Sequence, residues 1–236
     1  MIFAERALLP AGWAEQVRIT VAYGQITKVA KAAAPQPGDS RVSALLPALS
    51  NLHSHAFQRA MAGMTEHRIA GRDSFWTWRD LMYRFLDRLT PEQMEAIAAL
   101  VFMEMQEAGY AAVGEFHYVH HDPAGRPYAD AAELAWRVVA AARTAGIALT
   151  LLPVFYAHAG FGGTAATAGQ RRFVHTVYTF SQLVDRLRAA SAQRGYVLGV
   201  APHSLRAVMP AELDDVVAMA GAGAPVHIHA AEQTRE

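Results

Sequence analysis

Two pairs of histidines carry the clearest chemical signal in the sequence. His53 and His55 lie two residues apart in NLHSH, and His227 and His229 do so in HIHAAE, with Glu232 three residues further on. On an extended strand end, residues two apart point to the same side, so each pair can present both imidazoles to one metal ion. A catalytic zinc needs about three protein ligands and an open position for water, and the carboxylate would then move protons. One pair alone is as often an incidental pair of hydrogen-bonded histidines, but two pairs favour a metal site.

The composition limits which groups can do this chemistry. The 236 residues include no cysteine but 11 histidines, so any metal must be held by imidazoles and carboxylates. Equal numbers of basic and acidic residues, 21 of each, predict no nucleic-acid partner and no membrane partner. The N-terminal MIFAERALLP has charged residues where a secretory signal needs its apolar core, which indicates a cytoplasmic protein.

Short apolar strands alternate with amphipathic helices along most of the chain. Residues 1–43 alternate apolar and polar positions around a glycine, Gly24, which is typical of a small β domain with a hairpin. Beyond them we predict five buried strands, at residues 44–52, 111–117, 147–155, 196–203 and 225–230. Helices are predicted from Thr90 to Gly109 and at about residues 129–145, 172–194 and 210–222. This alternation implies a parallel sheet.

Most of the histidines fall at or just after the ends of these strands. Nine of the eleven do so, namely His53, His55, His117, His120, His121, His158, His203, His227 and His229. Such groups collect at the C-terminal rim of a (β/α)8 barrel, and the Gly-rich phosphate loop of an open doubly wound sheet is absent from the sequence. We therefore predict an α/β fold, a (β/α)8 TIM-like barrel, with residues 44–236 as its first five β/α units. Five strands do not close such a barrel, so the chain is expected to be truncated after strand five.

The segments PALSNLHSH and HIHAAEQ resemble the first and third metal motifs of the amidohydrolase superfamily, in the branch that deaminates small molecules. The resemblance implies that this is a metal-dependent hydrolase barrel, a distorted (β/α)8 barrel with a small β domain and one zinc ion per site. It also implies that His53, His55 and His229 hold the zinc and that Glu232 handles the proton. The superfamily uses the histidine three residues before the glutamate, so His229 is preferred to His227, which is assigned a structural role.

Longer segments resemble one family within this superfamily, the formimidoylglutamate deiminases. They are NLHSHAFQRAMAG, DSFWTWRDLMYR, EFHYVHHD, HAGFGG and HSLRAV. This resemblance implies hydrolysis of N-formimino-L-glutamate to N-formyl-L-glutamate and ammonia, a step of histidine degradation. By the same resemblance, the residues that bind the small-molecule substrate are Gln58, Arg79, Tyr118, His203 and Arg206. The two arginines would hold the two substrate carboxylates.

Several alternatives stay open at this point. Arg79 and Arg206 could instead be ion-paired surface arginines. Another deaminase or a chlorohydrolase-like enzyme, acting on a nucleobase or triazine ring, is the alternative within the superfamily, although two pocket arginines favour a dicarboxylate. A different class of function is a half-barrel that binds metal or a partner chain without turnover, because the superfamily's aspartate ligand and a further histidine would lie beyond Glu236. The histidines of residues 117–121 are assigned to the surroundings of the site. The oligomeric state is open, with a homodimer as one option.

Overall fold

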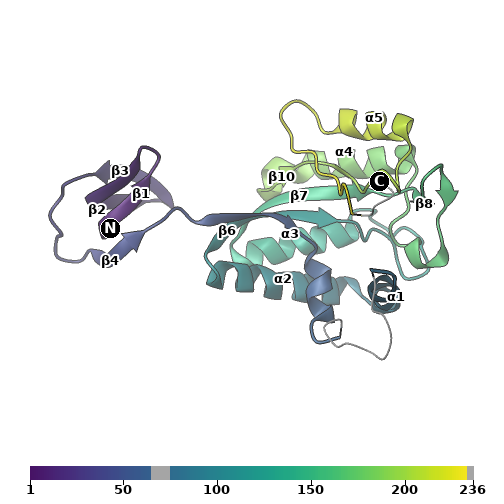
Figure 1. Cartoon of the computed structure of the whole chain (residues 1–236), viewed down its shortest axis with the longest axis horizontal. Helices are drawn as coiled ribbons and strands as arrows, with labels where there is room; N and C mark the ends of the chain where they lie inside the picture. Colours follow the sequence, from purple (N-terminus) through teal and green to yellow (C-terminus); the bar gives the residue numbers. More distant parts are fainter. Residues whose placement is uncertain (65–74, 233–236) are drawn as a thin grey trace. The chain divides into compact units, whose positions relative to one another are not determined.

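The computed structural model describes residues 1–64 and 75–232 (Figure 1). Residues 65–74 and 233–236 lie outside the described residues, and His67, one of the two histidines not predicted at a strand end, is among them. The chain divides into two compact units, Met1–Leu49 and Ser50–Glu236. Among the residues described, no helix combines the length and the apolar character needed to cross a membrane.

The smaller unit is a four-stranded sheet. Its strand order is β3-β2-β1-β4, and its strands are β1 (Ile2–Leu9), β2 (Gly12–Ala22), β3 (Gln25–Ala30) and β4 (Ser40–Leu45). β2 and β3 are antiparallel and are joined by Tyr23 and Gly24, both with positive φ, as expected for a tight hairpin turn. The predicted hairpin at Gly24 is therefore confirmed. The core of this unit is small and consists of Ala4, Ala7, Val17 and Ile19.

The larger unit is built on a parallel sheet. Its order is β10-β7-β6-β5, with β11 also paired to β7, and its strands are β5 (Leu49–Ser54), β6 (Tyr110–His117), β7 (Ala148–Phe155), β10 (Val197–Leu198) and β11 (Ala201–Pro202). β6, β10 and β11 all run parallel to β7. The parallel α/β architecture predicted from the alternating strands and helices is confirmed.

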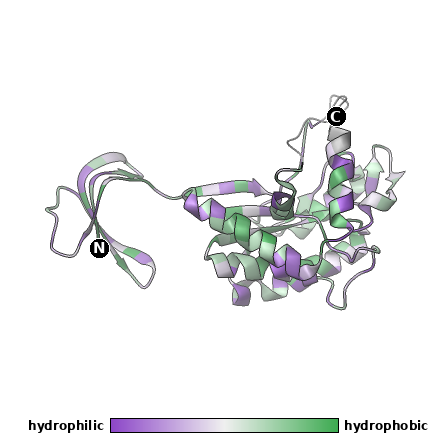
Figure 2. Cartoon of the chain, turned by 90° about the horizontal axis from the view of Figure 1, so that it is seen from below, coloured by the Kyte–Doolittle hydropathy of each residue, from purple (hydrophilic) through white to green (hydrophobic). Residues whose placement is uncertain are grey.

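Four helices pack against the strands of this sheet (Figure 1). They are α2 (Pro91–Glu107), α3 (Glu133–Ala145), α4 (Val177–Arg194) and α5 (Pro210–Met219), whereas α1 (Phe75–Leu86) lies against the short helices η1 (Ala56–Met61) and η2 (Ala168–Gln170). Two short strands complete the unit, namely β8 (His158–Gly160) and β9 (Thr164–Ala165). Hydrophobic and hydrophilic stretches alternate along the helices, as expected where one helix face packs on a sheet (Figure 2).

Local sequence signals explain where the helices begin. Thr90 and Gln93 form a reciprocal capping box at the start of α2, with Pro91 in the first turn, as predicted. α4 begins at Val177 rather than near residue 172, because Thr176 accepts a hydrogen bond from the backbone N–H of Thr179 and caps the helix there. α3 begins four residues later than the predicted 129, and the preceding Asp130 carboxylate accepts a hydrogen bond from the backbone N–H of Ala132.

The predicted strand at residues 225–230 is only partly formed. Two isolated parallel bridges join Val200 to Val226 and Ser204 to His229, with the His229 N–H donating to the carbonyl of His203 at 3.0 Å. The segment thus follows β11 along its length without becoming a continuous strand. The backbone of Val200 both donates to the carbonyl of Pro225 and accepts from the N–H of His227, so pairing begins at Pro225 and is interrupted before His229. The bridges still bring His229 to the edge of the sheet where β5 ends.

A buried arginine connects the end of α1 to the segment before α4. The Arg172 side chain is 1% exposed, and its guanidinium donates to the carbonyls of Leu86, Leu89 and His121. Carbonyl oxygens compensate part of the cost of burying this charge. Because α1 also carries Arg79, this contact helps to hold a predicted substrate-binding residue in place.

Four histidines cluster outside the predicted metal site. The ring centroids of His117 and His120 are 5.3 Å apart, and the His175 ring lies 4.8 Å from those of His120 and His121. Burial lowers the pKa of His117 to about 4 and that of His175 to about 3. These side chains are neutral in the folded protein at pH values where the unfolded chain would take up protons.

This cluster predicts a loss of stability in mild acid. Below about pH 6.5 the unfolded state protonates these histidines while the folded state does not, so the free energy of unfolding falls as the pH drops toward 4. His175→Asn should flatten this dependence by at most about 1.4 kcal/mol per pH unit. Urea unfolding followed by tryptophan fluorescence at pH 4.5 to 8 measures it.

The value at pH 8, where histidines are neutral in both states, serves as the control for the packing cost of the substitution. The buried Glu115, whose pKa is raised to about 8, contributes in the opposite direction and is unchanged between the two proteins. Identical slopes for the parent and His175→Asn would contradict the assignment.

Candidate metal centre and active site

Three histidine nitrogens converge at the carboxyl edge of the parallel sheet. His53 and His55 lie at the end of β5, and His229 follows the second bridge to the β11 segment. The Nε2 atom of His53 is 3.1 Å from Nε2 of His55 and 3.0 Å from Nε2 of His229. Among the described residues, these three side chains form the one group of histidines and carboxylates that could hold a metal ion. His227 is not part of it, and its ring lies 6.3 Å from that of His53.

The lowered pKa values of His53 and His55 favour neutral rings, whose unprotonated nitrogens can bind a cation. His55 donates from Nδ1 to the carbonyl of Phe116 at 3.1 Å, which directs the Nε2 lone pair of the neutral ring toward the other two histidines. Burial lowers the pKa of His55 to about 3 and also lowers that of His53. Nitrogens bound to one tetrahedral zinc ion would be roughly 3.3 Å apart, which is close to the distances here. The donor set therefore fits a zinc ion.

A polar cavity of about 140 Å³ opens beside this cluster. Its lining brings together residues from α1, η1, the strand ends and the segment after His229. The lining residues are His55, Gln58, Trp78, Arg79, Met82, Tyr83, Tyr118, Tyr156, His203, Arg206, His229 and Glu232. All five residues predicted to bind substrate, and Glu232, therefore face the same space as two of the three clustered histidines.

Hydrogen bonds fix the orientation of the uncharged lining residues. The Gln58 amide donates to the Tyr118 hydroxyl at 2.8 Å, and that hydroxyl donates to the sulfur of Met82 at 3.3 Å. Burial raises the pKa of Tyr118, so its hydroxyl stays protonated. The Nδ1 atom of His203 lies 3.0 Å from the Ser204 hydroxyl, and burial keeps the pKa of His203 well below its usual value. This wall of the cavity is neutral and preorganised.

The charged lining residues are two arginines and one carboxylate. Arg206 forms an ion pair with Glu232. The Arg79 guanidinium carbon lies 5.5 Å from the centroid of the Tyr83 ring, within cation–π range. Neither arginine is exposed as the surface interpretation would require, because the Arg206 side chain is 15% exposed and Arg79 is half-buried.

Two tyrosines of the lining were not predicted from the sequence. Tyr156 directly follows β7, and its hydroxyl accepts a hydrogen bond from the Gln170 amide at 2.5 Å. Tyr83 lies one turn after Arg79 on α1, against Gly169, where a Cβ would meet the Tyr83 ring at 2.3 Å. The position of Tyr156 at a strand end was the available signal, the same one that identified the histidines.

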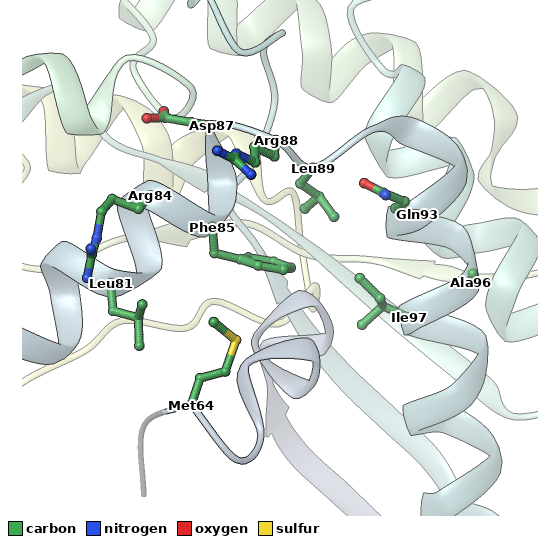
Figure 3. Close-up of a pocket in the computed structure, with 10 residues that line it drawn as sticks. All are labelled: Met64, Leu81, Arg84, Phe85, Asp87, Arg88, Leu89, Gln93, Ala96 and Ile97. Carbon is green, nitrogen blue, oxygen red and sulfur yellow. The ribbon is translucent and has the colours of Figure 1, made fainter. Parts of the chain in front are cut away.

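A larger hollow of about 700 Å³ lies elsewhere, between α1 and α2 (Figure 3). Its lining is mainly apolar, with Leu81, Phe85 and Ile97 facing the space. None of the described residues that line it is a histidine. This hollow is larger than the cavity beside the histidines, but the groups that can bind a metal and a charged substrate line the smaller cavity. The smaller cavity is therefore the candidate active site.

Two family models match the chain, one for each part. Residues 1–43 match the model described as formimidoylglutamate deiminase HutF, N-terminal domain, and residues 44–236 match the amidohydrolase family. The chain belongs to the amidohydrolase family. Its barrel unit thus has the α/β fold of these metal-dependent hydrolases, as predicted.

Two relatives are similar over the whole chain. A formimidoylglutamate deiminase from Pseudomonas aeruginosa is 54% identical over 236 residues, which are 100% of this chain and 52% of that protein. The crystal structure of an amidohydrolase from Brucella melitensis is 54% identical, with a TM-score of 0.94, and the match covers 100% of this chain and 52% of that one. The chain therefore spans about half the length of these relatives.

More distant amidohydrolase structures share the fold alone. Atrazine chlorohydrolase from Arthrobacter aurescens, complexed with zinc and atraton, is 18% identical with a TM-score of 0.71, covering 97% of this chain and 52% of that one. Guanine deaminase from C. acetobutylicum is 12% identical with a TM-score of 0.69, covering 99% and 54%.

The histidine cluster predicts binding of one zinc ion by this amidohydrolase. His229→Ala should lose most of the zinc, because two imidazoles bind a divalent ion much more weakly than three, whereas His227→Ala should retain it. Zinc per chain after dialysis, measured by elemental analysis, distinguishes the variants. Equal loss of zinc in both would show that the assignment of His229 over His227 is wrong.

Proposed function

We propose that this chain supplies the zinc-binding histidines and most of the substrate pocket of a formimidoylglutamate deiminase. In this proposal the enzyme hydrolyses N-formimino-L-glutamate to N-formyl-L-glutamate and ammonia. His53, His55 and His229 bind the zinc ion, and Glu232 transfers the proton. Gln58, Arg79, Tyr118, His203 and Arg206 bind the substrate. The 54% identity to the Pseudomonas aeruginosa enzyme over the whole chain supports this activity.

The observation that carries the proposal is the pair of arginines in a small cavity next to three clustered histidines. N-formimino-L-glutamate has two carboxylates, and two guanidiniums can hold one each through charge-assisted hydrogen bonds. A neutral ring such as guanine or a triazine would leave both guanidiniums without an anionic partner from the substrate. The charge of the cavity therefore favours a dicarboxylate.

The ion pair between Arg206 and Glu232 links substrate binding to proton transfer in the proposed reaction. A substrate carboxylate that binds Arg206 competes with Glu232 for the same guanidinium. Glu232 would then be released toward the histidine cluster, where it can accept a proton from the attacking water and deliver it to the departing nitrogen. Binding of the correct substrate would thus free the proton-transfer group.

The uncharged residues would orient the substrate. The Tyr118 hydroxyl, held by Gln58, offers a fixed polar contact, and the neutral His203 ring lies 4.9 Å from that of His229. A zinc ion held by the three histidines would supply Lewis-acid activation of water and of the formimino group. Because Tyr118 is buried and His203 is partly buried, their polar contacts are fixed before a substrate binds.

The remaining features of the proposal concern organisation. We propose residues 1–43 as the small β domain and residues 44–236 as the first five β/α units of the barrel, in accord with the ranges of the two family matches. A small-molecule substrate follows from the deiminase assignment. A cytoplasmic location and a homodimer stay predictions.

The substrate assignment predicts a specific activity. The product of the complete reading frame that encodes this chain, loaded with zinc, should release ammonia from N-formimino-L-glutamate and not from guanine or a triazine. Ammonia release measured with the three compounds decides between them. Turnover of guanine alone would overturn the substrate, and zinc binding without any turnover would favour the metal-binding half-barrel.

The role of Glu232 predicts a separation of metal binding from turnover. In the same protein, Glu232→Gln should keep its zinc but lose about 10²- to 10⁴-fold in kcat, because an amide cannot accept the proton. Glu212→Gln is the matched control, since Glu212 pairs with His158 outside the cavity. Near-normal ammonia release from Glu232→Gln would contradict the proton-transfer role.

A further inference from the structure

Three consecutive residues at the end of β6 each contact the segment that carries His53 and His55. The Phe116 carbonyl accepts the hydrogen bond from Nδ1 of His55. At Gly114, a Cβ would lie 2.8 Å from the carbonyl oxygen of Leu52, closer than Cβ atoms approach, so only glycine allows β6 to come this near. Between these two residues is Glu115, whose carboxylate oxygen Oε1 accepts from the backbone N–H of Ala56 at 2.7 Å.

Glu115 is a buried acid with no part in the proposed chemistry. It is 2% exposed, and burying a carboxyl group costs free energy unless hydrogen bonds compensate for the lost water. Phe116 lies on the metal side of the strand, with its ring 4.3 Å from that of His229. Side chains alternate along a strand, so Glu115 points to the opposite face and is not a metal ligand. Its second oxygen, Oε2, is without a hydrogen-bond partner among the described residues.

The contact with Ala56 falls at the turn that orients His55. Ala56 is the first residue of η1, and His55, the residue before it, makes no side-chain cap for this short helix. The amides of the first helical turn need acceptors from outside the helix. The Glu115 carboxylate supplies one for Ala56, directly after the metal-binding residue. Without it, a buried N–H would be left unsatisfied at the point where the chain leaves the cluster.

We propose that Glu115 is a positioning residue of the metal site, which holds His53 and His55 in register through the Ala56 amide. The inference rests on the proposed zinc site and extends it to a residue that touches neither metal nor substrate. The carboxyl group acts by fixing the turn from β5 into η1. Because this segment is already ordered, the three imidazoles can meet without a further loss of chain entropy when the ion binds.

The test measures zinc affinity and folding stability separately, in the product of the complete reading frame. Glu115→Leu keeps the volume but removes the acceptor, and it should weaken zinc binding about 10- to 100-fold in competition with a chromophoric chelator. Glu115→Gln keeps an acceptor for the Ala56 N–H and should bind zinc nearly as well as the parent. The visible spectrum of the Co²⁺-loaded protein should change with Leu and be restored with Gln.

Val113→Ala is the matched control. Val113 lies on the same face of β6 and is 2% exposed, but its side chain has no group that can form a hydrogen bond. It should lower the Tm of the metal-free protein without a selective loss of zinc affinity. Glu115→Asp, which shortens the side chain by one methylene and keeps the carboxyl group, gives a second variant if the leucine variant does not fold, and it should also bind zinc more weakly.

The outcomes separate this inference from the zinc site itself. A parent protein that binds no zinc overturns both. Normal zinc affinity in Glu115→Leu or Glu115→Asp, or an equal loss in Val113→Ala, overturns only the positioning role.

Discussion

The convergence of three imidazole nitrogens at one edge of a parallel sheet is the constraint on which the rest of the site depends. His53 and His229 are separated by 176 positions in the chain, yet their Nε2 atoms lie 3.0 Å apart. Parallel strands end at the same edge, so residues that follow different strands meet there without long loops. Unprotonated nitrogens at this spacing repel one another unless a proton or a cation lies between them. The cost of assembling the cluster is therefore best offset by binding a metal ion.

The charged residues of the cavity are the second important feature of the site. Desolvation lowers the pKa values of His53, His55 and His203 and so favours their neutral forms, while the two arginines are the basic groups of the lining and Glu232 is its acidic group. Arg206 and Glu232 satisfy each other in the described structure. A dianionic ligand can replace Glu232 at the arginine. In the proposed function, selection of a dianionic substrate and release of Glu232 for proton transfer are consequences of the same interaction.

The layer behind the site holds these groups in place through backbone contacts. At the end of β6, consecutive residues contact β5 and the two residues that follow it through a close backbone approach, a carboxyl group and a carbonyl. On the other side, Arg172 connects the end of α1 to the segment before α4 through carbonyl oxygens. Both contacts satisfy buried polar groups that would otherwise be costly. They also restrict the movement of the elements that carry His55 and Arg79.

The sequence alone was sufficient for the features that depend on neighbouring residues. The His53–His55 spacing at the end of an apolar run, the capping box that begins α2 and the hairpin at Gly24 are local, because backbone preferences and side-chain direction act over a few residues. The gathering of Arg79, Tyr118 and His203 was expected from family resemblance and not from local pattern.

Tertiary structure alone decided the features that depend on contacts between distant segments. Only the fold pairs Arg206 with Glu232 and places Glu115 against the Ala56 amide. It also reduces the predicted strand at 225–230 to two bridges. These outcomes follow from packing between segments far apart in the chain, where geometry and burial determine which polar groups meet. No short pattern of residues encodes that information.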